Sequence, residues 1–277
     1  MQIVKALDEL RTARRALPGS FGLVPTMGYL HAGHLSLVEQ ARTENDHVGV
    51  SIFVNPTQFG PSEDLASYPR NLDQDLALLR NAGVDLVWTP QPEDVYPANF
   101  QTWVDVTDMT QHLEGAHRPG HFQGVTTVVA KLFNAFTPDR AYFGQKDAQQ
   151  VAVIQRMVLD LNFPVDVIVC PTQREADGLA LSSRNAYLTS PQREAAPVLF
   201  RALSAAQAAH EAGERRGDEL RQVLRETLAG EPLALPQYVS AADPLTLDEL
   251  DFVENGVLLS LAVFVGKTRL IDNFLLE

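Results

Sequence analysis

The stretch Pro25-Thr26-Met27-Gly28-Tyr29-Leu30-His31-Ala32-Gly33-His34 decides the fold of this chain, because it joins a strand-like run to a helical one. The apolar run Phe21–Thr26 leads into it, and Leu35–Asn45 after it repeats apolar residues at helical spacing. Gly28 and Gly33 permit unusual backbone angles and let a ligand approach the main chain. The stretch therefore predicts a strand–turn–helix unit, which is the repeating unit of parallel α/β sheets.

The same alternation continues through the first two-thirds of the chain. Further strand-like runs are His47–Val54, Val84–Thr89, Arg140–Phe143 and Val165–Cys170, and helical runs are Leu72–Asn81, Val125–Phe136 and Ala148–Leu161. This rhythm predicts an α/β fold with a Rossmann-like parallel sheet and helices on both faces. Ligands of such sheets bind outside the carboxyl ends of the strands, so the loops after Thr26, Val54 and Phe143 are the candidate site.

A second, smaller unit is predicted beyond Thr189, where the sequence pattern changes. It combines alanine-rich helical runs with three strand-like runs, at Pro191–Ala212, Gly217–Leu228, Gln237–Ala242, Gly256–Val265 and Thr268–Phe274. We expect two domains with a boundary near Pro171: residues 1–171 form the nucleotide- and substrate-binding domain, and residues 172–277 form an α+β lid.

Composition excludes several classes of protein. The formal net charge is −13, from 22 basic and 35 acidic residues, which disfavours nucleic acid and anionic lipid as partners. No apolar run is long enough to span a bilayer, and the first residues become charged too soon for a signal peptide. The single cysteine, Cys170, excludes an intramolecular disulfide and a cysteine-based zinc site. The chain is expected to be cytoplasmic, and any anion site needs a local cluster of cations.

Two histidines of the opening stretch form such a site. His34 stands at the predicted helix start, where free N–H groups and the helix dipole favour anions. His31 can point at the same anion, and two imidazoles can donate hydrogen bonds to phosphate oxygens. The alternative is that one histidine caps the helix and the other lies on the surface. The glycine-containing strand–turn–helix context favours the phosphate site.

Polar side chains follow the next strands as well. Asn55 and Gln58 come after the second strand, and their neutral amides can orient hydroxyls and carboxylates without adding charge. Lys146 is a compact cation for phosphate, and Asp147 can accept from ribose hydroxyls or merely cap a helix. Gln150, one helical turn on, is expected to face the same cleft.

Two further loops carry cations. Arg118 and His121 precede the helical run at Val125, where they either bind an anion or belong to a simple capping loop. Ser182-Ser183-Arg184 lies just past the domain boundary and suits phosphate oxygens, in a lid that closes over the nucleotide. The alternative for this last stretch is a polar interdomain loop.

Other apparent motifs do not predict a functional site. Val265-Gly266-Lys267-Thr268 imitates the end of a P-loop, but Leu261 stands where that motif needs glycine, so a turn between two strands is expected. No G-x-G-x-x-G occurs. His112, His117 and His121 lack the cysteines or carboxylates that would complete a metal site, so no metal-binding residues are assigned.

Together these stretches resemble the pantoate–β-alanine ligase (pantothenate synthetase) family, of the HxGH nucleotidyltransferase-like superfamily. The resemblance covers essentially the whole chain and rests on six ordered motifs: Pro25–His34, Phe53–Phe59, Tyr68–Arg70, Arg118–Val125, Phe143–Gln150 and Asp177–Asn185.

The resemblance implies an ATP-dependent ligation in two steps. The carboxylate of pantoate attacks the α-phosphate of Mg-ATP to give pantoyl adenylate and pyrophosphate, and the amine of β-alanine then displaces AMP. Such an enzyme needs positioning and charge stabilisation but no protein nucleophile. ATP as co-substrate, Mg²⁺ and a homodimer are implied with it. Asp64, Asp73 and Asp75 lie near the expected magnesium, although phosphates can hold most of that ion.

The resemblance also assigns residues. The catalytic set is His34, His31, Lys146 and Arg184. The nucleotide-binding set is Met27, Gly28, Tyr29, Leu30, His31, Ala32, Gly33, His34, Gly144, Gln145, Lys146, Asp147, Gln173, Leu181, Ser182, Ser183 and Arg184. The substrate-binding set is Gln58, Gln150, Asn55, Arg118 and His121.

The sequence departs from the family pattern at one position, and two other functions would explain some of the same motifs. Gln173 stands where the family commonly has valine near the adenine, and the contact there is often made by the backbone. Another HxGH-type adenylyltransferase would need more cations for a phosphate acceptor and would not explain Gln58 and Gln150. A non-catalytic ATP-binding regulatory protein would use the same loops, and turnover distinguishes it.

Overall fold

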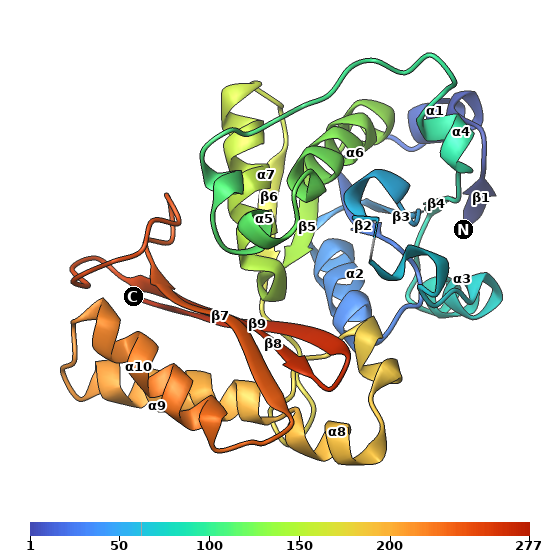
Figure 1. Cartoon of the computed structure of the whole chain (residues 1–277). Coiled ribbons are helices and arrows are strands. Elements are labelled where there is room, and N and C mark those ends of the chain that lie inside the picture. The colour runs from blue at the N-terminus through green and yellow to red at the C-terminus, as the bar shows by residue number, and fades with distance from the viewer. Residues whose placement is uncertain (62) are drawn as a thin grey trace.

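The chain forms a six-stranded parallel sheet followed by a three-stranded antiparallel one, in a computed structural model that describes residues 1–61 and 63–277 (Figure 1). The first sheet has the order β1-β4-β3-β2-β5-β6. Its strands are β1 (Gln2–Val4), β2 (Phe21–Thr26), β3 (His47–Ile52), β4 (Leu86–Trp88), β5 (Arg140–Gly144) and β6 (Asp166–Cys170). The predicted Rossmann-like sheet is confirmed.

Helices cover both faces of this sheet, as predicted. The main helices are α1 (Leu7–Arg15), α2 (Ala32–Glu44), α3 (Leu72–Asn81), α6 (His121–Phe136) and α7 (Ala148–Asp160). Neighbouring strand residues point to opposite faces: Leu23 packs with α1, α6 and α7, whereas Val24 packs with α2 and α3. Short helices occupy the connections, at α4 (Pro92–Val95), α5 (Leu113–His117), η1 (Pro56–Gln58), η2 (Asp64–Ala66), η3 (Met109–Gln111), η4 (Gln145–Asp147) and η5 (Ser183–Tyr187).

Some element boundaries differ from the sequence prediction. Helix α6 begins at His121 rather than Val125, because Gly120 adopts φ 81° and turns the chain into the helix one turn earlier. Strand β3 ends at Ile52 rather than Val54, just before the turn that Pro56 requires. Strand β1 and helix α1 were missed, because β1 has only three residues and pairs with β4, more than 80 residues away.

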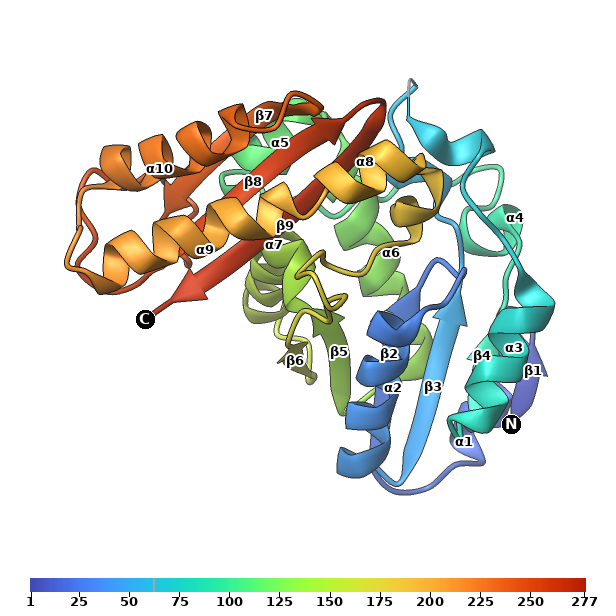
Figure 2. The same ribbon diagram turned by 90° about the horizontal axis from the view of Figure 1, so that it is seen from below.

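The C-terminal unit is an antiparallel sheet with helices on one face. Its elements are α8 (Ser190–Ala195), α9 (Val198–Glu211), α10 (Gly217–Ala229), β7 (Ala234–Ala242), β8 (Val257–Val265) and β9 (Thr268–Leu276). The single helix predicted over Pro191–Ala212 is wrong, because Pro197 interrupts the backbone hydrogen bonding and separates α8 from α9. Figure 2 shows α9 and α10 running along the strands.

Residues of β8 face two cores. Leu259 and Leu261 pack with α9 and α10, whereas Leu258 packs against Phe122 of α6 and Val153 of α7. The small sheet therefore lies directly on the first unit. The imitation P-loop is the tight turn between β8 and β9, as expected. Within the described part of the chain, no helix has the length and apolar character needed to cross a membrane.

Candidate active site

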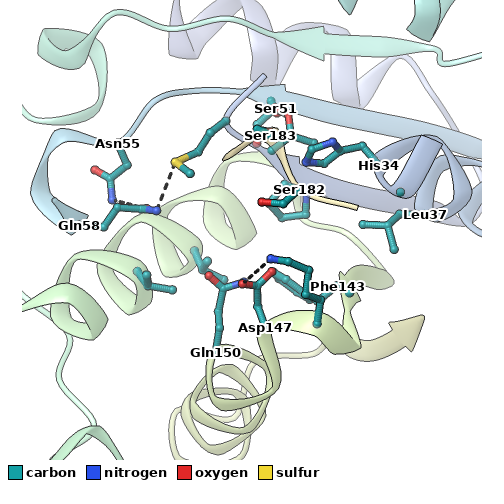
Figure 3. A pocket seen from close by; sticks show the side chains of 18 of the residues that line it. His34, Leu37, Ser51, Asn55, Gln58, Phe143, Asp147, Gln150, Ser182 and Ser183 are labelled. Carbon is teal, nitrogen blue, oxygen red and sulfur yellow. Dashed lines mark hydrogen bonds and ion pairs between the residues drawn. The ribbon is translucent and has the colours of Figure 1, made fainter. Parts of the chain in front are cut away.

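A cavity of about 240 Å³ lies at the carboxyl ends of β2, β3 and β5, where the sheet topology predicts it. Figure 3 shows His34, Ser182 and Ser183 toward one end, with Asn55 and Gln58 at the other and Gln150 rising from α7. Of the predicted residues, it is lined by Met27, His31, Gly33, His34, Asn55, Gln58, Arg118, His121, Gly144, Lys146, Asp147, Gln150, Gln173, Leu181, Ser182, Ser183 and Arg184.

The two histidines are fixed by backbone donors at the start of α2. His31 is the N-cap residue, and its Nδ1 accepts a hydrogen bond from the Gly33 amide at 3.1 Å. The Nδ1 of His34 accepts from the His31 amide at 3.3 Å. Since Nδ1 is an acceptor in both rings, the neutral tautomer carries its proton on Nε2. The rings lie with centroids 4.1 Å apart, so two N–H donors stand side by side.

Both imidazoles are neutral at pH 7. Burial, and then the charge of Lys146, lowers the pKa of His31 to about 4. Burial lowers the pKa of His34 to about 3, with His31 and Lys146 adding repulsion. The pair therefore offers neutral hydrogen-bond donors, and the positive charge comes from Lys146.

The glycines of this turn have different roles. Gly28 adopts φ 82°, as its predicted conformational role requires. Gly33 has ordinary helical geometry instead, and the space it leaves is what matters: a Cβ there would lie 3.0 Å from the His31 ring. The loop between them is held by Asp75, a carboxylate only 2% exposed. It accepts from the amides of Tyr29 at 2.8 Å and Leu30 at 2.7 Å.

Amide side chains line the opposite end. Gln58 donates from Nε2 to the sulfur of Met27 at 3.2 Å, and its Oε1 accepts from Asn55 at 3.1 Å. Asn55 is 1% exposed and also donates to the carbonyl oxygen of Gly124 at 3.1 Å. Asn55 therefore orients Gln58, and the Gln58 amide faces a partly apolar chamber.

His121 is hydrogen-bonded to two other residues at this end of the cavity. Its Nδ1 donates to the Gln58 carbonyl oxygen at 2.8 Å, and its Nε2 accepts from Arg118 at 3.0 Å. Burial, and then the Arg118 charge, lowers the pKa of His121 to about 4. His121 is thus a neutral residue that holds Gln58 and Arg118 and itself lines the cavity, and its substrate-binding role stays a prediction.

The two arginines of the cavity are each held by one of two consecutive acids. Arg118 pairs with Glu63 at 2.7 and 2.9 Å, and Arg184 pairs with Asp64 at 3.1 and 2.9 Å. In both pairs the guanidinium uses its Nε and Nη2 atoms, which leaves Nη1 free of that carboxylate. Lys146 is less constrained, with its Nζ 3.7 Å from Asp147 Oδ1.

Five predicted residues do not line this cavity: Gly28, Tyr29, Leu30, Ala32 and Gln145. The side chain of Gln145 turns away to Asn273 of β9, at 3.0 Å. Sequence reasoning missed the apolar wall that α6 contributes with Val125, Val128, Val129 and Leu132, as well as Tyr68 beside Arg184. The sequence does not distinguish the residues of that wall from the ordinary hydrophobic core of a helix. Tyr68 belongs to one of the quoted motifs, but no role was assigned to it.

Fold and site together define an α/β protein of the HxGH nucleotidyltransferase type, with a pair of histidines at the start of α2. The model of the pantoate–β-alanine ligase family matches residues 2–275. The chain is 61% identical to the pantothenate synthetase of Roseiflexus castenholzii over the full length of both proteins. This chain belongs to the pantoate–β-alanine ligase family.

Solved structures agree with this assignment. The pantothenate synthetase of Thermus thermophilus superposes with a TM-score of 0.95 at 50% identity, covering 99% of both chains. The pantoate–β-alanine ligase of Francisella tularensis, described in complex with β-γ ATP and β-alanine, superposes with a TM-score of 0.82 at 38% identity. It covers 99% of this chain and 97% of that one.

Proposed function

We propose that this chain joins pantoate to β-alanine with ATP, through pantoyl adenylate, and releases AMP and pyrophosphate. One observation carries the proposal: the neutral imidazole donors and the Lys146 ammonium line the same cavity as the amides of Gln58 and Gln150. The donors and the ammonium suit polyphosphate, and the amides suit a hydroxy acid.

In the first step, a carboxylate oxygen of pantoate forms a bond to the α-phosphorus of ATP, and the bond from that phosphorus to the bridging oxygen of pyrophosphate breaks. Negative charge grows on the phosphate oxygens during this transfer. The Nε2–H groups of His31 and His34 donate to these oxygens, while Lys146 and Arg184 supply positive charge. Positioned donors need no reorganisation as the charge develops. The carboxylate of pantoate is itself the nucleophile, so the step uses no protein nucleophile.

Pantoate occupies the amide end of the cavity in this proposal. Gln58 and Gln150 bind its hydroxyl and carboxylate groups, and Asn55 keeps Gln58 in orientation through their 3.1 Å hydrogen bond. Neutral amides are suited to this task because they orient the carboxylate without neutralising it as a nucleophile. The apolar wall from α6 accommodates the carbon skeleton and excludes water, which would hydrolyse the adenylate.

In the second step, the uncharged amine of β-alanine attacks the acyl carbon, AMP leaves with the electron pair of the broken bond, and the amine loses a proton. Arg118 lies at this end of the cavity, beside Gln58. We assign it to the carboxylate of β-alanine, with His121 holding it in place. The β-alanine named for the Francisella tularensis structure supports this substrate.

The remaining residues seat the nucleotide. Met27, Gly144, Asp147, Gln173 and Leu181 also line the cavity, and Met27 lies beside Gln58. A Cβ at Gly144 would meet nothing within 4 Å, so this position is open to a ligand. We assign adenosine to this region and the phosphates to the serines and Arg184.

Magnesium is proposed as part of Mg-ATP. Among the described residues, no group of three His, Cys, Asp or Glu side chains is placed to hold a metal ion. Asp64 is paired with Arg184, and Asp75 accepts two backbone amides. This donor set fits a magnesium ion that the phosphate oxygens hold.

A cytoplasmic location, the domain division at Pro171 with a C-terminal lid, and a homodimer are proposals too. Light scattering tests the dimer, which has twice the 30.5 kDa chain mass.

Pyrophosphate exchange into ATP tests the function. The wild-type protein should exchange labelled pyrophosphate only when pantoate is present, because the first step is reversible and precedes β-alanine. Exchange without pantoate, or exchange that depends on an amino acid instead, would contradict the assignment. Absence of any turnover would favour the regulatory ATP-binding alternative.

His34→Ala tests the donor role in the same assay. Loss of one positioned transition-state donor should lower kcat by about 10²–10³-fold, by analogy with oxyanion-hole deletions. His112→Ala, at a half-exposed position outside this cavity, is the matched control and should retain wild-type turnover. Near-normal turnover of His34→Ala would mean that this residue only shapes the start of the helix.

A further inference from the structure

The turn that carries Lys146 is held by a residue of the C-terminal sheet. Asn273 of β9 donates from its Nδ2 to the carbonyl oxygen of Gln145 and to that of Lys146, both at 2.9 Å. Its Oδ1 accepts from the side chain of Gln145 at 3.0 Å. All of these contacts join residues 127 or 128 positions apart in the chain.

Burial makes these hydrogen bonds important. Asn273 is only 4% exposed, so water has little access to replace a lost partner. Two of the three bonds go to main-chain carbonyl oxygens of the 3₁₀ turn Gln145–Asp147. They therefore fix the peptide planes on either side of the Lys146 Cα, and with them the direction in which its side chain leaves the backbone.

Lys146 itself has few other restraints. Its ammonium lies 3.7 Å from Asp147 Oδ1, which is a loose contact within the same turn. A lysine side chain has four rotatable bonds, so its charge is placed accurately only if the backbone beneath it is fixed. In the structure, Asn273 supplies that restraint from the other sheet.

Asn273 is also held in place by its own neighbour. The carboxylate of Asp272 accepts from the Asn273 amide at 2.9 Å and pairs with Arg174 at 2.6 and 2.9 Å. Arg174 leads into the segment that ends in Ser182 and Ser183. Adjacent residues of β9 thus hold two segments beside the proposed nucleotide site, and of these two residues it is Asn273 that donates hydrogen bonds to the Lys146 turn.

We propose that Asn273 is a positioning residue for adenylate formation: it sets Lys146 against the phosphates and makes the first step depend on the docked C-terminal sheet. This inference rests on the proposed phosphate role of Lys146. It goes further because it assigns the positioning of the Lys146 side chain to a residue that does not line the cavity.

Asn273→Ala should lower kcat for pantoate-dependent pyrophosphate exchange by about 10–100-fold, since a misplacement near 1 Å can cost this much. The KM for pantoate should change less than twofold, because the side chain of Asn273 is hydrogen-bonded to Gln145 and Lys146 rather than to Gln58 or Gln150. Ser260→Ala is the matched control: Ser260 pairs with Asn273 across β8 and β9, is buried, and its hydroxyl has no hydrogen-bond partner among the residues that the structure describes. It should retain wild-type kcat, and an equal loss in both variants would overturn the proposal.

A double-mutant cycle distinguishes positioning from general support of the fold. If Asn273 acts through Lys146, Asn273→Ala should cost less than about threefold in a Lys146→Ala background, although it costs at least tenfold alone. The same fold-loss in both backgrounds would overturn the proposal. So would near-normal kcat of Asn273→Ala. Failure of wild-type exchange would instead refute the proposed function, so the two failures are distinguishable.

Asn273→Ser keeps the test usable if the alanine variant does not fold. Its hydroxyl can replace at most one of the two donated bonds, so kcat should fall between those of wild-type and Asn273→Ala. The same cycle with Lys146→Ala applies. A serine variant with an unchanged melting temperature and wild-type kcat would refute the positioning role.

Discussion

Acidification should destabilise the protein through three histidines that the fold keeps neutral. Burial lowers the pKa of His34 to about 3 and those of His31 and His121 to about 4. In the unfolded chain all three groups have a pKa of about 6.5. Since the folded pKa is depressed, the stability is fully present above pH 6.5 and is lost as the pH falls toward the folded values.

The size of the loss follows from the number of protons taken up. Between pH 7 and pH 5 each unfolded imidazole gains a proton that its folded counterpart does not bind. At about 1.4 kcal/mol per pKa unit, this costs about 2 kcal/mol for each of His34 and His121, about 4 kcal/mol together, and the more exposed His31 adds to the loss in the same direction. The loss is a large part of the roughly 5–15 kcal/mol that stabilises an ordinary domain.

Urea unfolding at pH 7, 6 and 5 measures this loss. Trp88, a residue 2% exposed in β4, reports unfolding of the sheet on which the helices that carry these histidines pack. In His121→Asn, which cannot take up the proton, the free energy of unfolding should fall by about 2 kcal/mol less than in the wild type over the same range. An unfolding free energy equal at pH 7 and pH 5 would refute the neutral-histidine assignment. So would a His121→Asn variant with the full pH dependence of wild type.

Three further changes test separate parts of the site. Gln58→Leu should raise the KM for pantoate at least tenfold and that for ATP less than threefold, because only the amide end of the cavity changes. Asp64→Asn should raise the KM for ATP about 2–10-fold, since Arg184 loses the carboxylate that orders it and must be immobilised on binding. Gly124→Ala should destabilise by about 1–3 kcal/mol and lower Tm by about 2–10 °C, because its Cβ would lie 2.5 Å from the Thr57 carbonyl oxygen.

Each of these has a contrary result. Equal KM changes for both substrates in Gln58→Leu would place that residue outside a pantoate site. An unchanged or lower KM for ATP in Asp64→Asn would mean that the carboxylate does not help to order Arg184. Gly144→Ala is the stability control for Gly124→Ala, because its Cβ meets no atom within 4 Å. A Tm as high in Gly124→Ala as in this control would contradict the packing explanation.

Local sequence determined five of the six strands of the parallel sheet, the loops that follow them and most of the candidate site. Strand β2 and helix α3 occupy the predicted residues, because runs of buried apolar residues and helical spacing are local properties. His31, Gln58 and Lys146 meet at one cavity because the carboxyl ends of parallel strands share one edge of the sheet. Strand order was not needed for that prediction.

Only the tertiary structure decided how these groups are held and charged. The neutral tautomers of His31 and His34 depend on burial and on amide donors whose direction no motif states. The pairing of Arg184 with Asp64 joins residues 120 positions apart, and the hold of Asn273 on the Lys146 turn spans 127. Sequence pattern reports which residue types follow one another, whereas such contacts are set by the packing of separate elements. The sequence was therefore sufficient to predict which residue types meet at the site. Their hydrogen bonds, protonation states and exact positions depend on the tertiary structure.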